Sequence, residues 1–267
     1  MFRTLRKCIG VLLVCIIVLM ILSQQTNNSN QQTYTEEAIT VDIPNNPYND
    51  SNFYNDNSWL RYEDDTYTSL VGIDVSSHQE VIDWSLVKSS GVDFAMIRLG
   101  YRGYESGEIH DDAYFVSNMQ QATNQNIETG VYFFSQAITI EEAIEEANYV
   151  LLKIVDYSLA FPIVYDMEYV GGDDRISQLS IEEKTQIALA FCQTIESAGY
   201  TPMIYGSASW FNDDVFLGSL LDYPRWVASY NSTPGFAPEF IMWQYTNKGS
   251  IEGIDGEVDF NIYFKKK

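Results

Sequence analysis

Short apolar runs alternate with amphipathic stretches from residue 70 to residue 267. Eight of these runs have the length and apolar character of buried strands. They span residues 71–75, 93–99, 130–135, 162–167, 201–206, 225–229, 240–245 and 258–262. The pattern therefore predicts a core of eight strands.

Helical segments are expected between the first five strands and after the fifth. Asp83 can cap a short helix that runs to Ser90. Thr139 and Ser180 are each followed three residues later by a glutamate, which is the spacing of a capping box. Strands that alternate with helices form parallel sheets with right-handed crossovers. We therefore expect an α/β fold, an irregular (β/α) TIM-like barrel of about five β/α units followed by three strands with short connections.

Residues 24–69 lack a sustained apolar period and are dominated by Asn, Gln, Ser, Thr and acidic side chains. This composition predicts a polar, flexible stalk in front of a barrel domain at residues 70–267. The aromatic residues of the segment, among them Tyr48, Trp59 and Tyr62, are too many for an inert linker. Their number favours docking of the last part of the stalk on the barrel.

The first 23 residues have the organisation of an export segment. Arg3, Arg6 and Lys7 precede an apolar stretch at residues 8–22. The stretch is slightly shorter than the roughly 17–25 residues of a spanning helix, yet no small-x-small cleavage site follows it. Two alternatives stay open: an uncleaved signal anchor, which we favour, and a cleaved signal peptide. Both predict an extracytoplasmic protein, either membrane-anchored through this segment or secreted.

The charge of the chain limits its possible binding partners, and its cysteine content limits its possible disulfides. The net charge of −22 and the pI of about 4.2 argue against nucleic acid and anionic lipid surfaces, which bind to basic patches. Cys8 and Cys15 lie in the apolar segment, so Cys192 has no partner for a disulfide within the barrel domain. We expect Cys192 to be a small core side chain.

Two carboxylates end the fourth predicted strand. Asp166 and Glu168 are two residues apart and therefore point to the same side of the strand, with backbones roughly 6–7 Å apart. Carboxylates this close cannot both ionise freely, so one pKa is expected to rise toward that of a general acid. The alternative is a pair of solvated residues at a strand end.

Asp74 and Asp259 complete a set of four acidic candidates. Asp74 ends the first strand and Asp259 opens the eighth, and closure of a barrel makes these strands neighbours. Taken singly, Asp74 is as well explained by a turn, and Asp259 by a contact that ties a loop. Together with Asp166 and Glu168 they predict a carboxylate cluster at the mouth of the barrel.

Aromatic and amide side chains gather at the same strand ends. The candidates for contact with a substrate are Tyr101, Tyr132, Tyr205, Tyr230, Trp243 and Gln244. Core packing explains any one of these aromatics, but sugar rings stack on Tyr and Trp, and amides pair with hydroxyl or acetamido groups. Aromatic residues combined with carboxylates favour a carbohydrate cleft.

Other chemistries find little support in the sequence. His78 and His110 are the only histidines, and neither belongs to an H-x-x-x-H or H-E-x-x-H pair, so a metal site is not predicted. The G-x-S-x-G and G-x-x-x-x-G-K-[ST] motifs are also absent.

An ordered set of motifs resembles the family 25 glycoside hydrolases, lysozymes that cut bacterial peptidoglycan. The motifs are GIDVSSHQ at 72–79, FAMIR at 94–98, GVYFF at 130–134, YDME at 165–168, WVASY at 226–230, MWQY at 242–245 and VDFN at 258–261. The resemblance implies hydrolysis, without a cofactor and with net retention, of the β-1,4 bond from N-acetylmuramic acid to N-acetylglucosamine. One departure is Phe133, where many members have a polar residue.

We interpret the sequence as an N-acetylmuramidase with a monomeric catalytic domain that acts on peptidoglycan glycan strands. In this interpretation Glu168 is the general acid, Asp166 assists it, and Asp74 and Asp259 orient groups and support charge. Two alternatives remain. The first is a barrel that binds wall glycans without catalysis, as part of a surface assembly, and the second is a hydrolase of another acetamido polysaccharide such as chitin.

Overall fold

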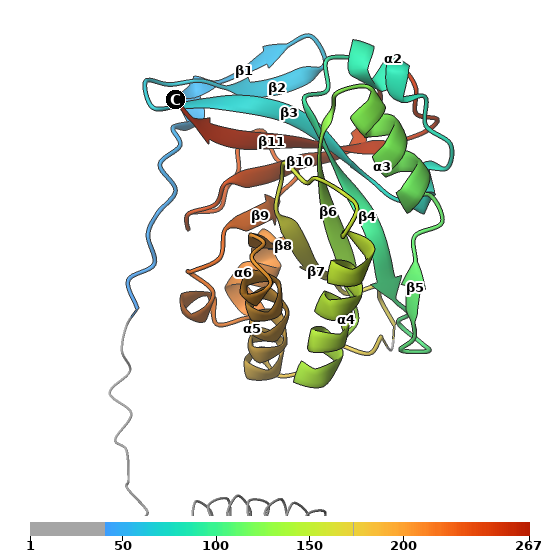
Figure 1. The fold of residues 1–267 in the computed structure, drawn as a ribbon. Helices are drawn as coiled ribbons and strands as arrows, with labels where there is room; N and C mark the ends of the chain where they lie inside the picture. Colours follow the sequence, from blue (N-terminus) through green and yellow to red (C-terminus); the bar gives the residue numbers. More distant parts are fainter. Residues whose placement is uncertain (1–40, 173) are drawn as a thin grey trace, which may run out of the picture. The chain divides into compact units, whose positions relative to one another are not determined.

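The computed structural model describes residues 41–172 and 174–267, and residues 42–267 form one compact unit (Figure 1). A closed barrel of eight strands lies at its centre, because β11 pairs with both β10 and β3, and β3 pairs with β4. The barrel strands are β3 (Tyr67–Val75), β4 (Phe94–Arg102), β6 (Glu128–Ser135), β7 (Ile163–Met167), β8 (Pro202–Ser207), β9 (Arg225–Ala228), β10 (Met242–Gly249) and β11 (Val258–Lys266). All eight predicted strands are present, and the expected irregular barrel is confirmed.

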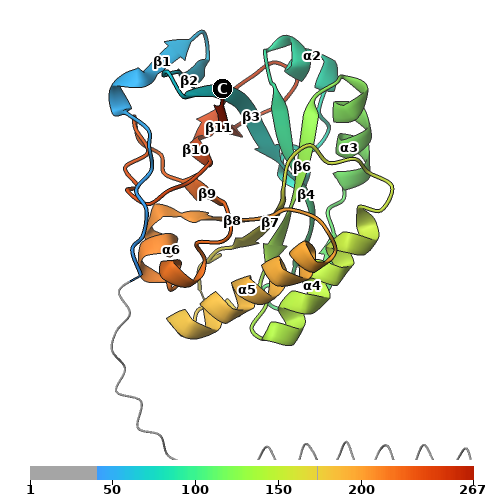
Figure 2. The same ribbon diagram turned by 60° about the vertical axis from the view of Figure 1, so that its left-hand side comes forward.

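Helices lie along the outside of the barrel (Figure 2). They are α2 (Trp84–Ser89), α3 (Phe115–Asn124), α4 (Ile140–Lys153), α5 (Ile181–Ser197) and α6 (Ala208–Asp213), with short 3-10 turns η1 (Asp50–Asn52), η2 (Ser77–Gln79) and η3 (Leu217–Ser219). The predicted caps form: Asp83, Thr139 and Ser180 each accept a hydrogen bond from the main chain of the first turn. Within the described residues no helix joins β9 to β10 or β10 to β11, as expected from the short connections.

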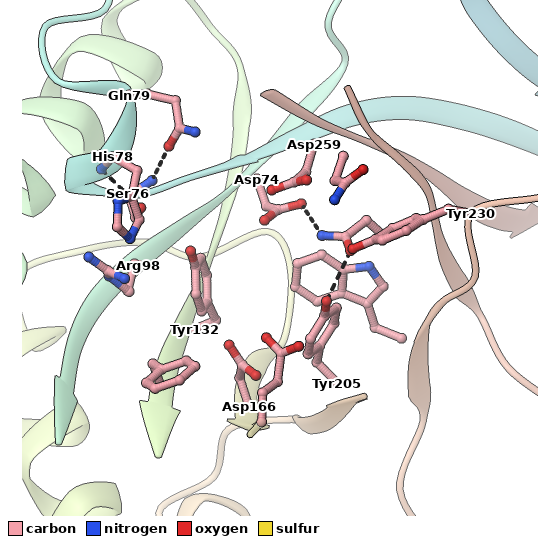
Figure 3. Close-up of a pocket in the computed structure, with 15 residues that line it drawn as sticks. Asp74, Ser76, His78, Gln79, Arg98, Tyr132, Asp166, Tyr205, Tyr230 and Asp259 are labelled. Atoms are coloured by element: carbon pink, nitrogen blue, oxygen red, sulfur yellow. Dashed lines mark hydrogen bonds between the residues drawn. The ribbon is translucent and has the colours of Figure 1, made fainter. Parts of the chain in front are cut away.

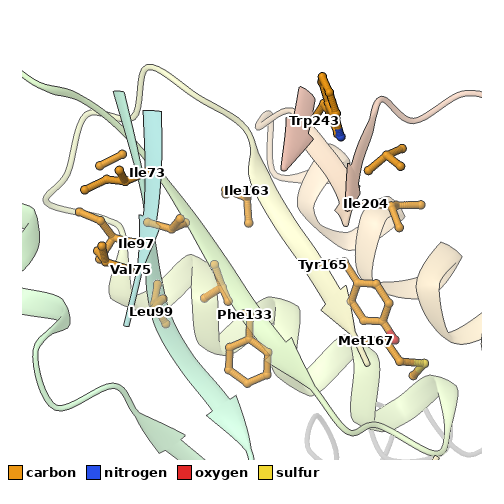
Figure 4. Close-up of a cluster of buried hydrophobic side chains, with 14 of the residues drawn as sticks. Ile73, Val75, Ile97, Leu99, Phe133, Ile163, Tyr165, Met167, Ile204 and Trp243 are labelled. Atoms are coloured by element: carbon orange, nitrogen blue, oxygen red, sulfur yellow. The ribbon is translucent and has the colours of Figure 1, made fainter. Parts of the chain in front are cut away.

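Side chains alternate between the two faces of each barrel strand, as the pleat requires. On β7, Val164 packs inside the barrel, whereas Ile163, Tyr165 and Met167 join the outer core beneath the helices. Figure 4 shows part of this outer core, in which side chains of β3, β4, β6 and β7 lie together. Cys192 of α5 is also fully buried there, as predicted. The strand parity therefore decides which residues can reach the barrel mouth.

The last part of the predicted stalk is packed on the barrel, as its aromatic residues indicated, and is not a flexible linker. Residues 42–69 are part of the compact unit and include a hairpin of β1 (Phe53–Asp56) and β2 (Trp59–Tyr62). Tyr62 is fully buried, and the ring of Tyr48 stacks on Phe264 with centroids 3.7 Å apart. Because no helix covers the outward apolar side chains of β10 and β11 in the described chain, the hairpin and the residues before it bury them instead.

The remaining parts of the predicted leader lie outside the described residues. This applies to the signal anchor or signal peptide at residues 1–23 and to the first part of the stalk, residues 24–40. Within residues 41–172 and 174–267, no helix is both long enough and apolar enough to cross a membrane.

Two strands run against the predicted parallel order. β11 is antiparallel to β3 and β10, and β5 (Ile109–Asp111), which the sequence pattern did not indicate, is antiparallel to β4. The reversal of β11 places its first residues beside the last residues of β3. Asp259 is directly opposite Asp74 in this pairing.

Candidate active site

A pocket opens where the parallel barrel strands end and β11 begins (Figure 3). Its lining residues come from all eight barrel strands or the loops that follow them. They are Asp74, Ser76, His78, Gln79, Arg98, Tyr132, Phe134, Asp166, Glu168, Tyr205, Trp226, Tyr230, Gln244, Asn247 and Asp259. All four acidic candidates and four of the six predicted contact residues therefore line one cavity.

Asp166 and Glu168 lie together at the end of β7. Asp166 is buried, and its Oδ1 has no hydrogen-bond partner among the described residues. Burial, followed by the charge of Glu168, raises the pKa of Asp166 well above its usual range. Burial also raises the pKa of Glu168 to about 7, the charge of Asp74 adds to this shift, and a hydrogen bond with Asp166 opposes it. The pair therefore retains a proton near neutral pH.

The raised pKa of Glu168 agrees with the sequence-based expectation, but only one of the two expected causes acts as expected. The expectation named the neighbouring Asp166 together with partial burial. In the structure desolvation is the largest cause, and Asp166 acts on Glu168 through a hydrogen bond that lowers the pKa. Strand parity could place the two carboxylates side by side, but it could not measure how deeply they are buried.

Asp74 and Asp259 form a second pair of carboxyl groups across the pocket from Asp166. Burial raises the pKa of Asp74, although hydrogen bonds from Asn261 and Gln244 oppose this shift. For Asp259, burial together with the charge of Asp74 and a hydrogen bond to it raises the pKa to about 9. At neutral pH, Asp259 thus carries a proton beside the better-stabilised carboxylate of Asp74.

Two amides fix the carboxylate of Asp74. Its Oδ2 accepts hydrogen bonds from Gln244 Nε2 and Asn261 Nδ2, both at 2.8 Å. The other end of each amide is also held. Gln244 Oε1 accepts from the hydroxyls of Tyr205 (2.9 Å) and Tyr230 (2.8 Å), and Asn261 Oδ1 accepts from the Trp226 indole (2.8 Å). These contacts fix both amide orientations, so Asp74 presents a preorganised negative charge.

Aromatic rings form the side walls of the cleft. Tyr132 and Tyr205 project from neighbouring parts of the barrel into the pocket, as Figure 3 shows. Tyr230 lines the pocket too but is 51% exposed, so its ring can be reached from solvent. Trp226 packs edge to face against Tyr205 with centroids 4.7 Å apart. Such walls suit flat sugar faces, which stack on aromatic rings.

Two predicted contact residues do not line the pocket. Trp243 is fully buried in the outer core, where its indole donates to the carbonyl of Ser229 and its ring packs against Phe53 (Figure 4). It neighbours Gln244 in the sequence, and adjacent strand residues face opposite sides, so only one of them can face the cleft. Tyr101 lies in the last part of β4 opposite His110 of β5, with its ring against the His110 ring and beneath the Arg98 guanidinium.

Phe133 also lies away from the pocket. It is fully buried in the outer core and meets the ring of Tyr149 on α4, because its neighbours Tyr132 and Phe134 take the inward positions of β6. The departure from the family pattern at this position therefore affects packing under the helix and not the lining of the cleft.

The sequence-based candidates omitted several residues of the pocket, of which Trp226, Arg98 and His78 are the most notable. Trp226 could have been found from parity, since it is two residues before the inward-facing Ala228. Arg98 donates to Asp112 Oδ2 and Ser77 Oγ, each at 2.8 Å, which holds the cation at the rim. No local pattern marked it, because Asp112 is distant in the sequence.

A barrel whose mouth holds proton-retaining carboxyl pairs between aromatic walls defines a glycoside hydrolase. Comparison with known proteins gives the family. The family model described as glycosyl hydrolases family 25 matches residues 73–254, which is more than half of the chain. The chain belongs to this family.

Relatives and solved structures agree with this assignment. The chain is 32% identical over 205 residues to the protein YegX of Escherichia coli K12, covering 74% of this chain and 70% of YegX. It is 30% identical to Lysozyme M1 of Streptomyces globisporus, covering 73% of this chain and 68% of that enzyme. The structure of the modular autolysin LytC from Streptococcus pneumoniae with a synthetic peptidoglycan ligand superposes with a TM-score of 0.66 and 27% identity. That match covers 74% of this chain and 47%, about half, of LytC.

Proposed function

We propose that the protein is a lysozyme, an N-acetylmuramidase that hydrolyses the β-1,4 bond between N-acetylmuramic acid and N-acetylglucosamine in bacterial peptidoglycan. The observation that carries the proposal is the pairing of buried Asp166 with half-buried Glu168 on the wall of an aromatic-lined cleft. Family membership supports it, as do the name of Lysozyme M1 and the peptidoglycan ligand of LytC.

Glu168 is the proposed general acid. Its pKa of about 7 leaves a large fraction protonated at neutral pH, so it can protonate the oxygen of the leaving sugar. Asp166 retains an unpartnered, buried Oδ1 in the same pocket. In the proposed mechanism this oxygen accepts a hydrogen bond from the substrate while Glu168 donates its proton, which assists the acid and orients the reacting sugar.

Asp74 and Asp259 support charge in this proposal. Cleavage of a glycosidic bond develops positive charge on the sugar ring. The carboxylate of Asp74, held by two amides, stabilises that charge without having to reorganise. Asp259 carries a proton, so Asp74 is the ionised member of this pair.

Digestion of purified walls tests the activity. Peptidoglycan treated with the full-length protein should give muropeptides with muramic acid at their reducing ends, identified by mass spectrometry. Glucosamine reducing ends, or products from chitin, would favour a hydrolase of another acetamido polysaccharide. Binding to walls without any product would favour the glycan-binding module.

We also propose that the enzyme works outside the cytoplasm, tethered to the membrane through residues 8–22 or secreted. The basic residues before this apolar stretch and the wall substrate of the proposed reaction support this location. A tether of polar residues would restrict the enzyme to nearby wall. Fractionation of cells that express the full chain tests it: membrane-bound protein with an intact N-terminus supports the tether, and a secreted product starting near Gln24 supports cleavage.

A further inference from the structure

The main chain at Glu168 is held by a side chain of the neighbouring strand. Ser135, the last residue of β6, is opposite Met167 of β7, and Gln136 follows beyond this last pair. Gln136 Nε2 donates to the main-chain oxygen of Glu168 at 2.8 Å. A carbonyl oxygen can only accept, so the amide nitrogen must be the atom that faces it. The contact is made at the residue proposed as general acid.

Gln136 does not belong to the lining of the cleft. Its side chain is fully buried, and it is absent from the residues that line the pocket. It continues the inward series of β6, Tyr132 and Phe134, by one further step of two residues. Gln136 is therefore buried at the strand ends, where it reaches Glu168 from behind without access to a substrate.

A second set of contacts holds Gln136 itself. The guanidinium of Arg175 donates to the main-chain oxygen of Gln136 at 2.9 Å and pairs with Glu142 Oε1 at 2.7 Å. Glu142, in the first turn of α4, also accepts from the main-chain nitrogen of Ile138 at 2.8 Å. The loop after β6, the start of α4 and the loop after β7 are thus joined at Gln136.

We propose that Gln136 is a positioning residue that fixes the main chain at Glu168 and so sets where the acid's carboxyl group lies in the cleft. β7 ends at Met167, so Glu168 is outside the regular strand pairing. The chain after it contains Gly171 and Gly172, both with positive φ, and no regular element until α5. The hydrogen bond from the Gln136 amide takes the place of the strand-to-strand hydrogen bond that Glu168 lacks. This inference rests on the proposed function of Glu168.

Loss of the donor should affect the chemical step more than binding. Misplacement of a catalytic group by about 1 Å can cost up to roughly 100-fold in rate. Gln136→Met keeps the length and fills the same space but cannot donate, whereas Gln136→Glu keeps the shape and, protonated in this buried position, can donate from its hydroxyl. We expect kcat on purified glycan strands to fall by about ten-fold or more in Gln136→Met, with KM changed less than two-fold, and to fall less in Gln136→Glu.

The experiment compares kcat, KM and Tm of the full-length wild type with those of Gln136→Met and Gln136→Glu, and with Gln193→Met as the matched control on the exposed face of α5. Arg175→Gln removes the contact to the Gln136 carbonyl and keeps the test decisive if the Gln136 variants do not fold. This variant should lower kcat by several-fold with KM unchanged. Unchanged kcat in the folded variants, or a rise in KM alone, overturns the inference while the proposed function stands. An inactive wild type overturns both.

Discussion

Asp259 is directly opposite Asp74 across the antiparallel pairing of β11 with β3, and burial together with the charge of Asp74 raises the pKa of Asp259 to about 9. Parallel barrels bring functional groups together at the carboxyl ends of strands. Here a residue at the start of a strand reaches the same place because its strand is reversed. The pair therefore combines one carboxylate and one neutral acid, and replacements at the two positions should not be equivalent.

Asp259→Asn should be much milder than Asp74→Asn. Asparagine resembles the protonated form that Asp259 takes below about pH 9, so we expect less than about a ten-fold loss of kcat. Asp74→Asn removes the charge, although its amide oxygen can still accept from Gln244 and Asn261, and we expect a loss of about 10²–10³-fold. Steady-state kinetics on peptidoglycan measure both. Equal losses would contradict the assignment of the proton to Asp259.

Glu168→Gln should abolish the release of reducing ends from purified peptidoglycan. Glutamine keeps the shape of the side chain but cannot deliver a proton, and general acid catalysis contributes about 10²–10⁴-fold. Because Gln is uncharged and the site is desolvated, Tm should not fall. Glu182→Gln, at an exposed position in the first turn of α5, is the matched control. More than a small residual fraction of activity in the folded Glu168→Gln variant would remove the acid role from Glu168.

The activity should decline on the alkaline side as pH rises through about 7. Glu168 must be protonated to act as the acid, and burial raises its pKa to about 7. The logarithm of kcat/KM should then fall by about one unit for each pH unit above this value. A profile measured from about pH 4 to pH 9 at constant ionic strength tests this. A rate that stays level to pH 9 would contradict the raised pKa.

The same buried acids make stability depend on pH. Burial raises the pKa of Glu146 and of Glu168 to about 7 each, and that of Asp259 to about 9. A carboxyl with a raised folded-state pKa binds its proton more tightly when folded. Its stabilising contribution is complete below the unfolded pKa of roughly 4 and is lost as pH rises through the folded value. We expect Tm to fall between about pH 5 and pH 9, and less steeply in Glu168→Gln. Tm that rises across this range would contradict the shifts.

Removal of the N-terminal hairpin should destabilise the barrel. Trp59 is 3% exposed, donates its indole N–H to the carbonyl of Ser90 at 2.8 Å and lies against the ring of Phe260. Trp59→Ala should lower the free energy of unfolding by about 3–5 kcal/mol, as for other buried aromatics. Tyr54→Ala, at a half-exposed position of the same hairpin, should cost less than about 1 kcal/mol. Denaturant unfolding measures both, and equal effects would show that the hairpin packs loosely.

The sequence predicted the barrel well because its strands are continuous apolar runs with clear ends. Strand parity placed Asp166 and Glu168 on one side of their strand. It was not applied to Trp243, which is adjacent to the inward-facing Gln244 and therefore faces the outer core. Trp226 was not predicted as a pocket residue, because it lies early in a short strand and the candidates were sought at strand ends.

Other features depend on contacts that no local pattern encodes. The aromatic residues of segment 42–69 indicated docking on the barrel, but its polar composition gave no sign of a hairpin. The contact of Gln136 with Glu168 joins residues on different strands through one amide and leaves no trace in either segment. The desolvation that raises the pKa of Glu168 arises from the assembled barrel.

The reversed last strand also links the site to the order in which the chain is made. Asp74 and Asp259 are 185 positions apart, so a nascent chain that has been synthesised only through β10 lacks one member of the pair and has an open barrel. Its cleft forms only after Val258–Lys266 has been delivered. Under the proposed function, an enzyme built this way would be inert until its last strand has been added to the barrel.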